Sequence, residues 1–218
     1  MKILAFDTST QQCSVALLCG NEIKDISLDA PNQHAELLLP LIHRLLHEAG
    51  LSLTQLNAIG FSRGPGSFTG LRIAASLAQG LACAHDIPVA AISTLQMMAQ
   101  ATHLTQHAER IAVAMDARMQ QIYWGTFAGT GIMLPTCPEQ VLSPNEVILA
   151  GKDWTAVGTA WQVYSDSLLF LQPQLAHIDT KSLPQARNLI PLAQYQIEQK
   201  LTVSAENALP IYLRDKVC

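Results

Sequence analysis

The chain has 218 residues, of which 14% are charged, well below the roughly 25% of an ordinary soluble domain. There are 13 Lys and Arg residues and 17 Asp and Glu residues, a formal net charge of −4, and no basic cluster is visible. The composition therefore argues against unaided binding to nucleic acid, which depends on neutralising phosphates.

The cysteines and the first residues of the chain indicate the cellular compartment of the protein. Cys13, Cys19, Cys83, Cys137 and Cys218 are scattered without a C-x-x-C pair, which argues against a disulfide framework or a zinc knuckle and predicts reduced thiols. The first apolar run ends after six residues, too short for a signal peptide, and no 18-residue apolar segment follows. We expect a cytoplasmic protein that does not enter a membrane.

The first predicted element is a hairpin whose leading strand ends in an aspartate. Ile3 to Asp7 is an apolar strand, and Ser14 to Cys19 follows it after a polar turn. Residues 111–127 repeat this pattern with Asp116 in the place of Asp7, and a Gln-Gln pair aligns in both copies. The repeat favours two similar lobes of about 100 residues. Chance similarity between two β-hairpins is the alternative.

A leucine-rich helix is predicted from Asn32 to Ala49, after a strand at residues 23–28. Asn32 is its predicted cap, Gly50 its predicted end, and Pro40 predicts a bend or a later start. The apolar residues exceed a single core-facing stripe, which suggests a contact with another subunit. The leucines that we assign to this contact are Leu37, Leu41 and Leu45.

A glycine-rich loop joins the next strand, Leu56 to Phe61, to a second helix. Residues 62–74 read SRGPGSFTGLRIA, in which Ser67 or Thr69 can cap the helix. Bare N–H groups at a helix start can hold phosphate. However, the G-x-G-x-x-x-G spacing misses the dinucleotide fingerprint, and no G-K-[ST] follows, so phosphate binding is the weaker interpretation.

The helix from Gly70 to Ala84 carries one charged side chain, Arg72, and small residues around its circumference. A surface helix should show a polar face, so we expect both sides of this helix to be covered, one of them by a partner. A helix buried wholly within its own domain is the alternative. The predicted partner contacts on this helix are Leu71, Ala74, Ala75, Ala78, Leu81 and Ala82.

The rest of the chain follows a similar order of strands and helices, but the pattern of apolar residues becomes weaker toward the C-terminus. A strand at residues 89–93 precedes the second hairpin, and short strands at 132–134 and 155–157 and a helix near 185–200 follow it. Residues 161–184 show no readable pattern. The order predicts an α/β protein in which helices flank mixed sheets, with lobes at 1–100 and 101–218, the second incomplete.

Five motifs together resemble the bacterial TsaB family. They are DTS at 7–9, HAELLLP at 34–40, GPGSFTGLR at 64–72, DAR at 116–118 and YLR at 212–214. The resemblance implies an actin-like, sugar-kinase-like (ribonuclease H-like) fold of duplicated lobes. It also implies a part in making N6-threonylcarbamoyladenosine at position 37 of tRNAs that read codons beginning with A.

The resemblance further implies partners. The family is a non-catalytic partner of a paralogue, TsaD, which transfers the threonylcarbamoyl group, and a small ATPase, TsaE, joins the pair. It implies a homodimer when the chain is alone, tRNA reached only through the complex, and no cofactor beyond the ATP that the assembled complex uses. The H-x-x-x-H metal pair of the paralogue is replaced here by TLQMM at 94–98, and thioethers do not replace imidazoles on such a metal.

The alternative is an independent actin-like ATPase or kinase in which Asp7 and Asp116 handle metal-bound phosphates. Ser9 stands where such a turn has glycine, and the second turn has no glycine at all. We therefore expect Asp7, Ser9 and Asp116 to mark a degenerate nucleotide site and expect no catalytic residue. The pairs at 43/47 and 103/107 are histidines four residues apart, but each lacks a third ligand, and no metal site is expected.

Overall fold

A computed structural model describes residues 1–214 of the chain. The chain divides into two compact units. The first contains Met1–Met97 and Pro184–Ile211, and the second contains Met98–Leu183 and, of the described C-terminal residues, 212–214.

The first unit is built on a five-stranded sheet in the order β3-β2-β1-β4-β5. β1 pairs antiparallel with β2 and parallel with β4, and β4 pairs parallel with β5. Central β1 and β4 are almost fully buried, as their apolar sequences require. The strands are β1 Lys2–Asp7, β2 Gln12–Cys19, β3 Glu22–Asp29, β4 Ala58–Gly64 and β5 Val89–Ser93.

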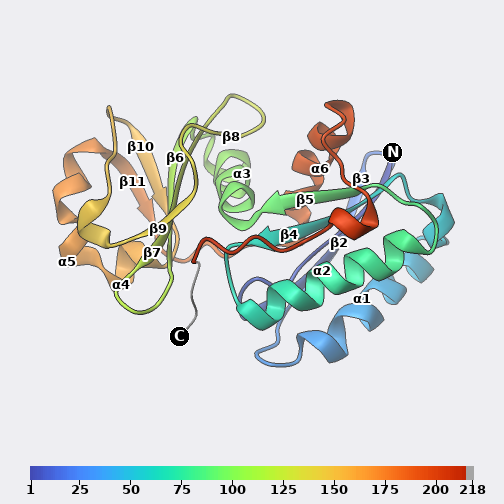
Figure 1. The fold of residues 1–218 in the computed structure, drawn as a ribbon. Coiled ribbons are helices and arrows are strands. Elements are labelled where there is room, and N and C mark those ends of the chain that lie inside the picture. The colour runs from blue at the N-terminus through green and yellow to red at the C-terminus, as the bar shows by residue number, and fades with distance from the viewer. Residues whose placement is uncertain (215–218) are drawn as a thin grey trace. The chain divides into compact units, whose positions relative to one another are not determined.

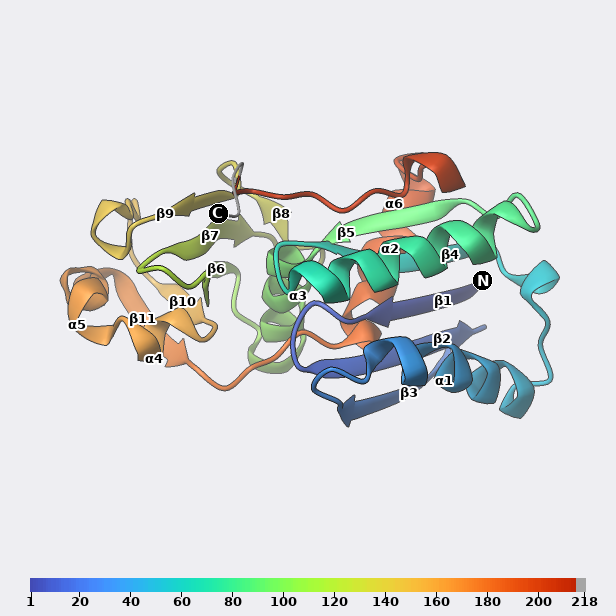
Figure 2. The same ribbon diagram turned by 60° about the horizontal axis from the view of Figure 1, so that its bottom comes forward.

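Three helices cover this sheet. α1 (His34–Glu48) contacts β2 and α2 (Phe68–Cys83) contacts β4 on one face, while α6 (Leu189–Glu198) lies on the other face against β1, β4 and β5 (Figures 1 and 2). Buried residues recur every three or four positions along α1 and α2 and form the core with the inward residues of the sheet. The 3-10 turns of this unit are η1 (Leu53–Gln55), η4 (Ala186–Asn188) and η5 (Ala205–Asn207).

The helix ends test the capping predictions. Of the two predicted caps of α2, Ser67 and Thr69, the structure selects Ser67, whose hydroxyl accepts a hydrogen bond from the Gly70 N–H at 3.3 Å. Gly50 follows α1 with a left-handed φ of 62°, as predicted for a helix end. Asn32 as the cap of α1 was wrong: it has a left-handed φ of 64°, and Gln33 precedes the helix without a side-chain cap. α1 begins at His34 and continues through Pro40.

The second unit repeats the strand order of the first. Its path is β11-β10-β6-β7-β8, with β6 antiparallel to β7 and parallel to β10, and β9 also pairs with β7. The duplicated hairpins predicted at Asp7 and Asp116 are therefore equivalent in topology. The strands are β6 Arg110–Asp116, β7 Ile122–Ala128, β8 Leu134–Pro135, β9 Gln140–Leu142, β10 Trp154–Val157 and β11 Leu175–Asp179.

Short helical segments and one longer helix complete the second unit. Trp154 and Trp161 are both buried in its core, where the Trp161 ring packs against Trp124. β11 comes from the segment that shows no periodic pattern in the sequence. The helical segments are α3 Thr94–Gln106, α4 Ala160–Val163, α5 Ser165–Leu168, η2 Pro144–Glu146 and η3 Leu169–Gln174.

The unit boundaries differ from the predicted lobes at 1–100 and 101–218. The chain returns to the first unit at Pro184, because α6 packs against β1, β4 and β5. The Ser14 hydroxyl accepts the Ala186 N–H at 2.9 Å, and the Arg187 guanidinium lies 3.5 Å from the Asp25 carboxylate, so η4 is also anchored on the first sheet. The first unit is therefore formed by two stretches of the chain that are separated in sequence by residues of the second unit.

We predict that Ile190→Ala destabilises the first unit by about 2–5 kcal/mol, since Ile190 is fully buried between α6 and the sheet. Glu198→Ala, at the exposed end of the same helix, should change the free energy of unfolding by under about 0.5 kcal/mol. Urea denaturation of both variants measures this. Equal stability of the two variants would contradict the assignment of α6 to the first unit.

Candidate functional site

The first candidate site residue, Asp7, is inaccessible at the end of β1. Its side chain is fully buried, and Oδ1 accepts hydrogen bonds from the Ser62 hydroxyl and, at 3.2 Å, from the Ser9 N–H. Burial raises the pKa of Asp7 above its ordinary value, and the hydrogen bonds from Ser62 and Ser9 only partly oppose this shift. Burial, with the nearby Asp7, likewise raises the pKa of the Cys13 thiol to about 11.

The glycine loop receives the β1–β2 turn. The Ser67 N–H donates to the Ser9 carbonyl at 2.7 Å, and the Thr8 hydroxyl donates to the Gly70 carbonyl at 2.7 Å. A Cβ at Gly70 would lie 1.9 Å from the Thr8 carbonyl oxygen, and one at Gly66 would lie 2.4 Å from that of Ser9. Glycine is therefore required at both positions for the loop to contact the turn. Because the turn and the loop are in direct contact, a phosphate does not fit between them.

The second turn is held by different residues. Asp116 Oδ1 accepts the Arg118 N–H at 2.8 Å and the Tyr164 hydroxyl at 2.9 Å, while the Arg118 guanidinium lies 3.3 Å from Oδ2. Arg214 donates to the Ala117 carbonyl at 3.0 Å and to Gln121 Oε1 at 2.6 Å. The carboxylate of Asp116 is thus engaged within its own unit.

This turn also has an unusual backbone. Arg118, Met119 and Gln120 are three successive non-glycine residues with φ between 54° and 61°. Non-glycine residues in this region carry backbone strain, and they persist only where the surrounding structure holds them. Arg214 supplies those surroundings, which gives the C-terminal YLR motif a structural role.

The TLQMM segment at 94–98, where the resemblance implies a lost metal pair, is buried at its two methionines. Met97 and Met98 are buried, and Ser93 caps α3 by accepting the Leu95 and Gln96 N–H groups at 3.1 and 3.2 Å. Within residues 1–214, no three His, Cys, Asp or Glu side chains are placed to share a metal ion.

The histidines and cysteines have other surroundings. His34 begins α1, and its Nε2 lies 3.2 Å from the Gln12 carbonyl oxygen, a contact between the helix start and β2. His103 Nδ1 lies 2.8 Å from the Ala108 carbonyl. The cysteines at 13, 19, 83 and 137 are free thiols, while Cys218 lies outside the described residues. No helix of the described part is long and apolar enough to cross a membrane.

The predicted partner surface on α1 and α2 is corrected by the structure. Leu37 and Leu81 are half-buried at the surface, but the other predicted contacts are buried against the sheet of their own unit. These inward residues are Leu41, Leu45, Leu71, Ala74, Ala75, Ala78 and Ala82. Both predicted helices are present, but most of the residues chosen as partner contacts lie on their core-facing sides, because periodicity identifies an apolar face without saying which neighbour covers it.

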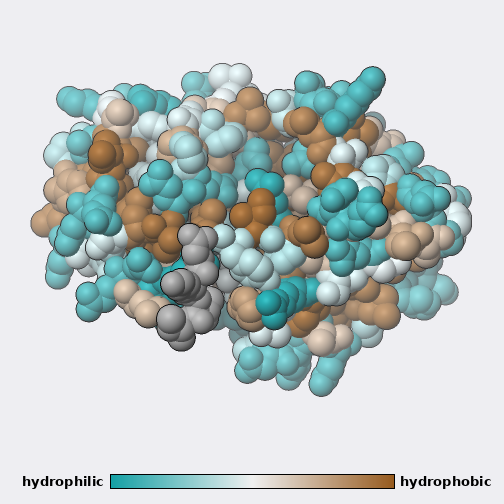
Figure 3. All heavy atoms as spheres, in the orientation of Figure 1, coloured by the Kyte–Doolittle hydropathy of each residue, from teal (hydrophilic) through white to brown (hydrophobic). Residues whose placement is uncertain are grey.

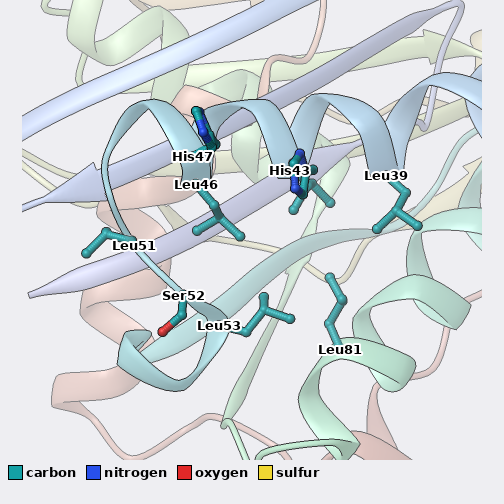
Figure 4. Close-up of a pocket in the computed structure, with 9 residues that line it drawn as sticks. Leu39, His43, Leu46, His47, Leu51, Ser52, Leu53 and Leu81 are labelled. Carbon is teal, nitrogen blue, oxygen red and sulfur yellow. The ribbon is translucent and has the colours of Figure 1, made fainter.

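The outer side of the same helices carries an apolar groove. It has a volume of about 300 Å³ and lies between the C-terminal half of α1, η1 and α2 (Figure 4). Leu39 is half exposed at one end, Leu81 points toward it from α2, and His43 and His47 lie along α1. Other exposed hydrophobic residues are spread among hydrophilic ones over the surface in Figure 3.

The strand order and the paired aspartate hairpins define the class. Two units with the same order of antiparallel and parallel neighbours form the duplicated, ribonuclease H-like architecture of actin-like and sugar-kinase-like proteins. Both aspartates lie at the strand ends expected for this class; Asp7 is buried, and the carboxylate of Asp116 is bonded to the Arg118 N–H and the Tyr164 hydroxyl.

The chain belongs to the TsaB family. It is 40% identical to the tRNA threonylcarbamoyladenosine biosynthesis protein TsaB of Haemophilus influenzae, over 100% of this chain and 95% of that protein. It is 39% identical to the Escherichia coli protein of the same name, over 100% and 96%. The family model "TsaD: tRNA N6-adenosine threonylcarbamoyltransferase" matches residues 28–218. The structure of YeaZ from Pseudomonas aeruginosa has a TM-score of 0.91 and 42% identity, over 97% of this chain and 99% of that one.

We predict that Gly70→Ala destabilises the first unit by at least about 2 kcal/mol, because the added Cβ meets the Thr8 backbone. Gly80→Ala is the matched control: it lies in the same helix, its Cβ meets nothing within 4 Å, and alanine favours a helix by up to about 1 kcal/mol. Denaturant unfolding of both variants measures the change in the free energy of unfolding. If Gly70→Ala were neutral, the turn would not require the glycine.

The buried carboxyl of Asp7 predicts a pH dependence. Because its folded-state pKa is raised, the folded chain binds more protons than the unfolded chain above pH 3.8, and stability falls as pH rises toward the raised pKa. Asp7→Asn removes this titration. The wild-type free energy of unfolding should therefore fall relative to that of the variant, by at most about 1.4 kcal/mol per pH unit. The same comparison with Asp29→Asn, an exposed acid of the same sheet, controls for general charge, and a difference that rises with pH would contradict the burial of Asp7.

Proposed function

We propose that this chain is a non-catalytic subunit that binds and activates the TsaD-type transferase making N6-threonylcarbamoyladenosine at position 37 of tRNAs that read codons beginning with A. The names of its relatives place those proteins in this biosynthesis, and the family model across residues 28–218 is that of the transferase. The chain thus resembles both the accessory protein and the enzyme.

The observation that carries the accessory role is the filled β1–β2 turn. Ser9 and Thr8 bond to the glycine loop, and Asp7 is buried behind them, so the fold's first phosphate position serves internal packing. The same geometry disfavours an independent ATPase or kinase. We propose that the chain uses no cofactor of its own and that ATP acts in the assembled complex.

The partner surface that we propose is the outer side of α1 and α2. Leu39, Leu81 and the groove between them offer apolar area beside exposed polar side chains, the composition of a separable interface. We propose that the transferase covers this face, that a second copy covers it when the chain is alone, and that a TsaE-type ATPase joins the complex. tRNA is reached only through the complex, in the cytoplasm.

The test mixes the purified chain with the TsaD-type paralogue and TsaE-type ATPase of the same organism, tRNA and the threonylcarbamoyl donor system. Light scattering should show a one-to-one complex with the transferase, and mass spectrometry should find modified tRNA only in its presence. ATP turnover or tRNA modification by the chain alone would contradict the accessory role.

Leu39→Glu locates the interface. It is half exposed, so the fold should persist, but an unpaired charge in the contact should weaken the complex at least about tenfold. The matched control is Leu169→Glu, the same substitution at a residue of the second unit that is 64% exposed. This variant should bind and activate as the wild type does. The reverse pattern would place the interface on the second unit.

A further inference from the structure

The tip of the second turn carries an exposed methionine. Met119 lies between Arg118 and Gln120, at the end of the β6–β7 hairpin, and is 72% exposed. The N-terminal Met1 is 45% exposed. The other methionines are at most 7% exposed; they are Met97, Met98, Met115 and Met133. A reagent in solution therefore reaches the sulfur of Met119 far more readily than the sulfurs of the core.

The sulfur of Met119 lies beside the guanidinium group that holds this turn. Nη1 of Arg214 donates to Met119 Sδ at 3.5 Å. Nη2 of the same group donates to the Ala117 carbonyl at 3.0 Å and to Gln121 Oε1 at 2.6 Å. A thioether sulfur is a weak acceptor. The bond from Nη1 is therefore the weakest of those that fix Arg214 on the turn.

Packing does not account for a methionine at this position. A side chain that is 72% exposed removes little apolar area from water. The backbone of Met119 has a φ of 54°, a left-handed conformation in which glycine, asparagine and aspartate are the usual residues. The turn thus presents a thioether where a small polar residue suits the backbone better, and the chemistry of the sulfur is what distinguishes it.

Oxidation converts this thioether into a strong hydrogen-bond acceptor. A hydroperoxide supplies the oxygen: the sulfur lone pair attacks one peroxide oxygen, and the S–O bond forms as the O–O bond breaks. The departing oxygen takes the proton of the transferred oxygen and leaves as water or an alcohol. The sulfur loses two electrons and the peroxide gains them. The product, methionine sulfoxide, is polar and carries an oxygen in place of a bare lone pair.

We propose that Met119 is a methionine oxidation site whose sulfoxide oxygen is bound by Arg214, so that a hydroperoxide tightens the second turn. The exposed side chain has room to turn its new oxygen toward Nη1, and hydrogen bonds to a charged donor are roughly twice as strong as neutral ones. Enzymatic reduction of the sulfoxide restores the thioether and reverses the change. This inference does not depend on the proposed function.

Peptide mass spectrometry of the full chain after brief treatment with dilute hydrogen peroxide tests the site. Met119 should gain one oxygen atom at least about tenfold faster than any of the four buried methionines, because its sulfur is exposed. Incubation with the two methionine sulfoxide reductases, one for each sulfoxide epimer, should remove that oxygen. Oxidation of Met119 no faster than that of the buried methionines would overturn the proposal.

Amide hydrogen exchange, followed by NMR, tests the tightening. The Ala117 N–H donates to the Gln121 carbonyl at 2.9 Å and the Gln121 N–H to the Arg118 carbonyl at 3.0 Å, so both amides report opening of the turn. Their exchange should be at least about threefold slower in the oxidised chain, because a stronger bond to Arg214 opposes opening. Met119→Leu, treated with the same peroxide, should show no change. Unchanged or faster exchange in the oxidised wild type would overturn the proposal.

Two further variants separate the role of Arg214 from simple exposure. Arg214→Lys keeps the charge but loses the planar fork, so Met119 should still be oxidised while the gain in protection is lost. Met119→Gln places an amide oxygen near Nη1 and should slow exchange relative to Met119→Leu without any peroxide. Full protection in oxidised Arg214→Lys, or equal exchange in the two Met119 variants, would overturn the role of Arg214. Failure of the unoxidised chain to bind the transferase would overturn only the proposed function.

Discussion

The contact between the β1–β2 turn and the glycine loop is the constraint on which the first unit depends. It joins the end of the central strand to the start of α2 through the Thr8–Gly70 and Ser9–Ser67 hydrogen bonds. The backbones approach this closely only because Gly70 and Gly66 have no Cβ. The same contact buries Asp7, so the position of the helix and the inaccessibility of the aspartate have one cause.

The two units reach the same result with different chemistry. In the first, backbone atoms of the glycine loop fill the turn; in the second, side chains from distant segments hold it, Tyr164 on Asp116 and Arg214 on the adjacent carbonyl groups. The two units thus share a strand order while their aspartate hairpins are held by different groups. Fold and function are separable in this way because chemistry belongs to the few side chains at a site.

The low charge content of the chain has two origins that the structure separates. Much of the apolar surplus of α1 and α2, including Ala78 and Leu45, is covered by the sheet of their own unit. What remains outside is the groove at Leu39 and Leu81 and the exposed side chain of Phe68. The exposed apolar area of these helices is therefore smaller than their composition alone indicates.

The sequence by itself determined the hairpins, the principal helices and the family, because these depend on local periodicity, turn chemistry and a specific motif. Only the tertiary structure decided that the chain returns to the first unit at Pro184, that Arg214 holds the second turn, and which side of α2 faces outward. Each of these is set by contacts between residues far apart in the chain. Local hydrophobic periodicity does not report such contacts. The same periodicity results whether a helix face is buried by the sheet of its own unit or by another protein.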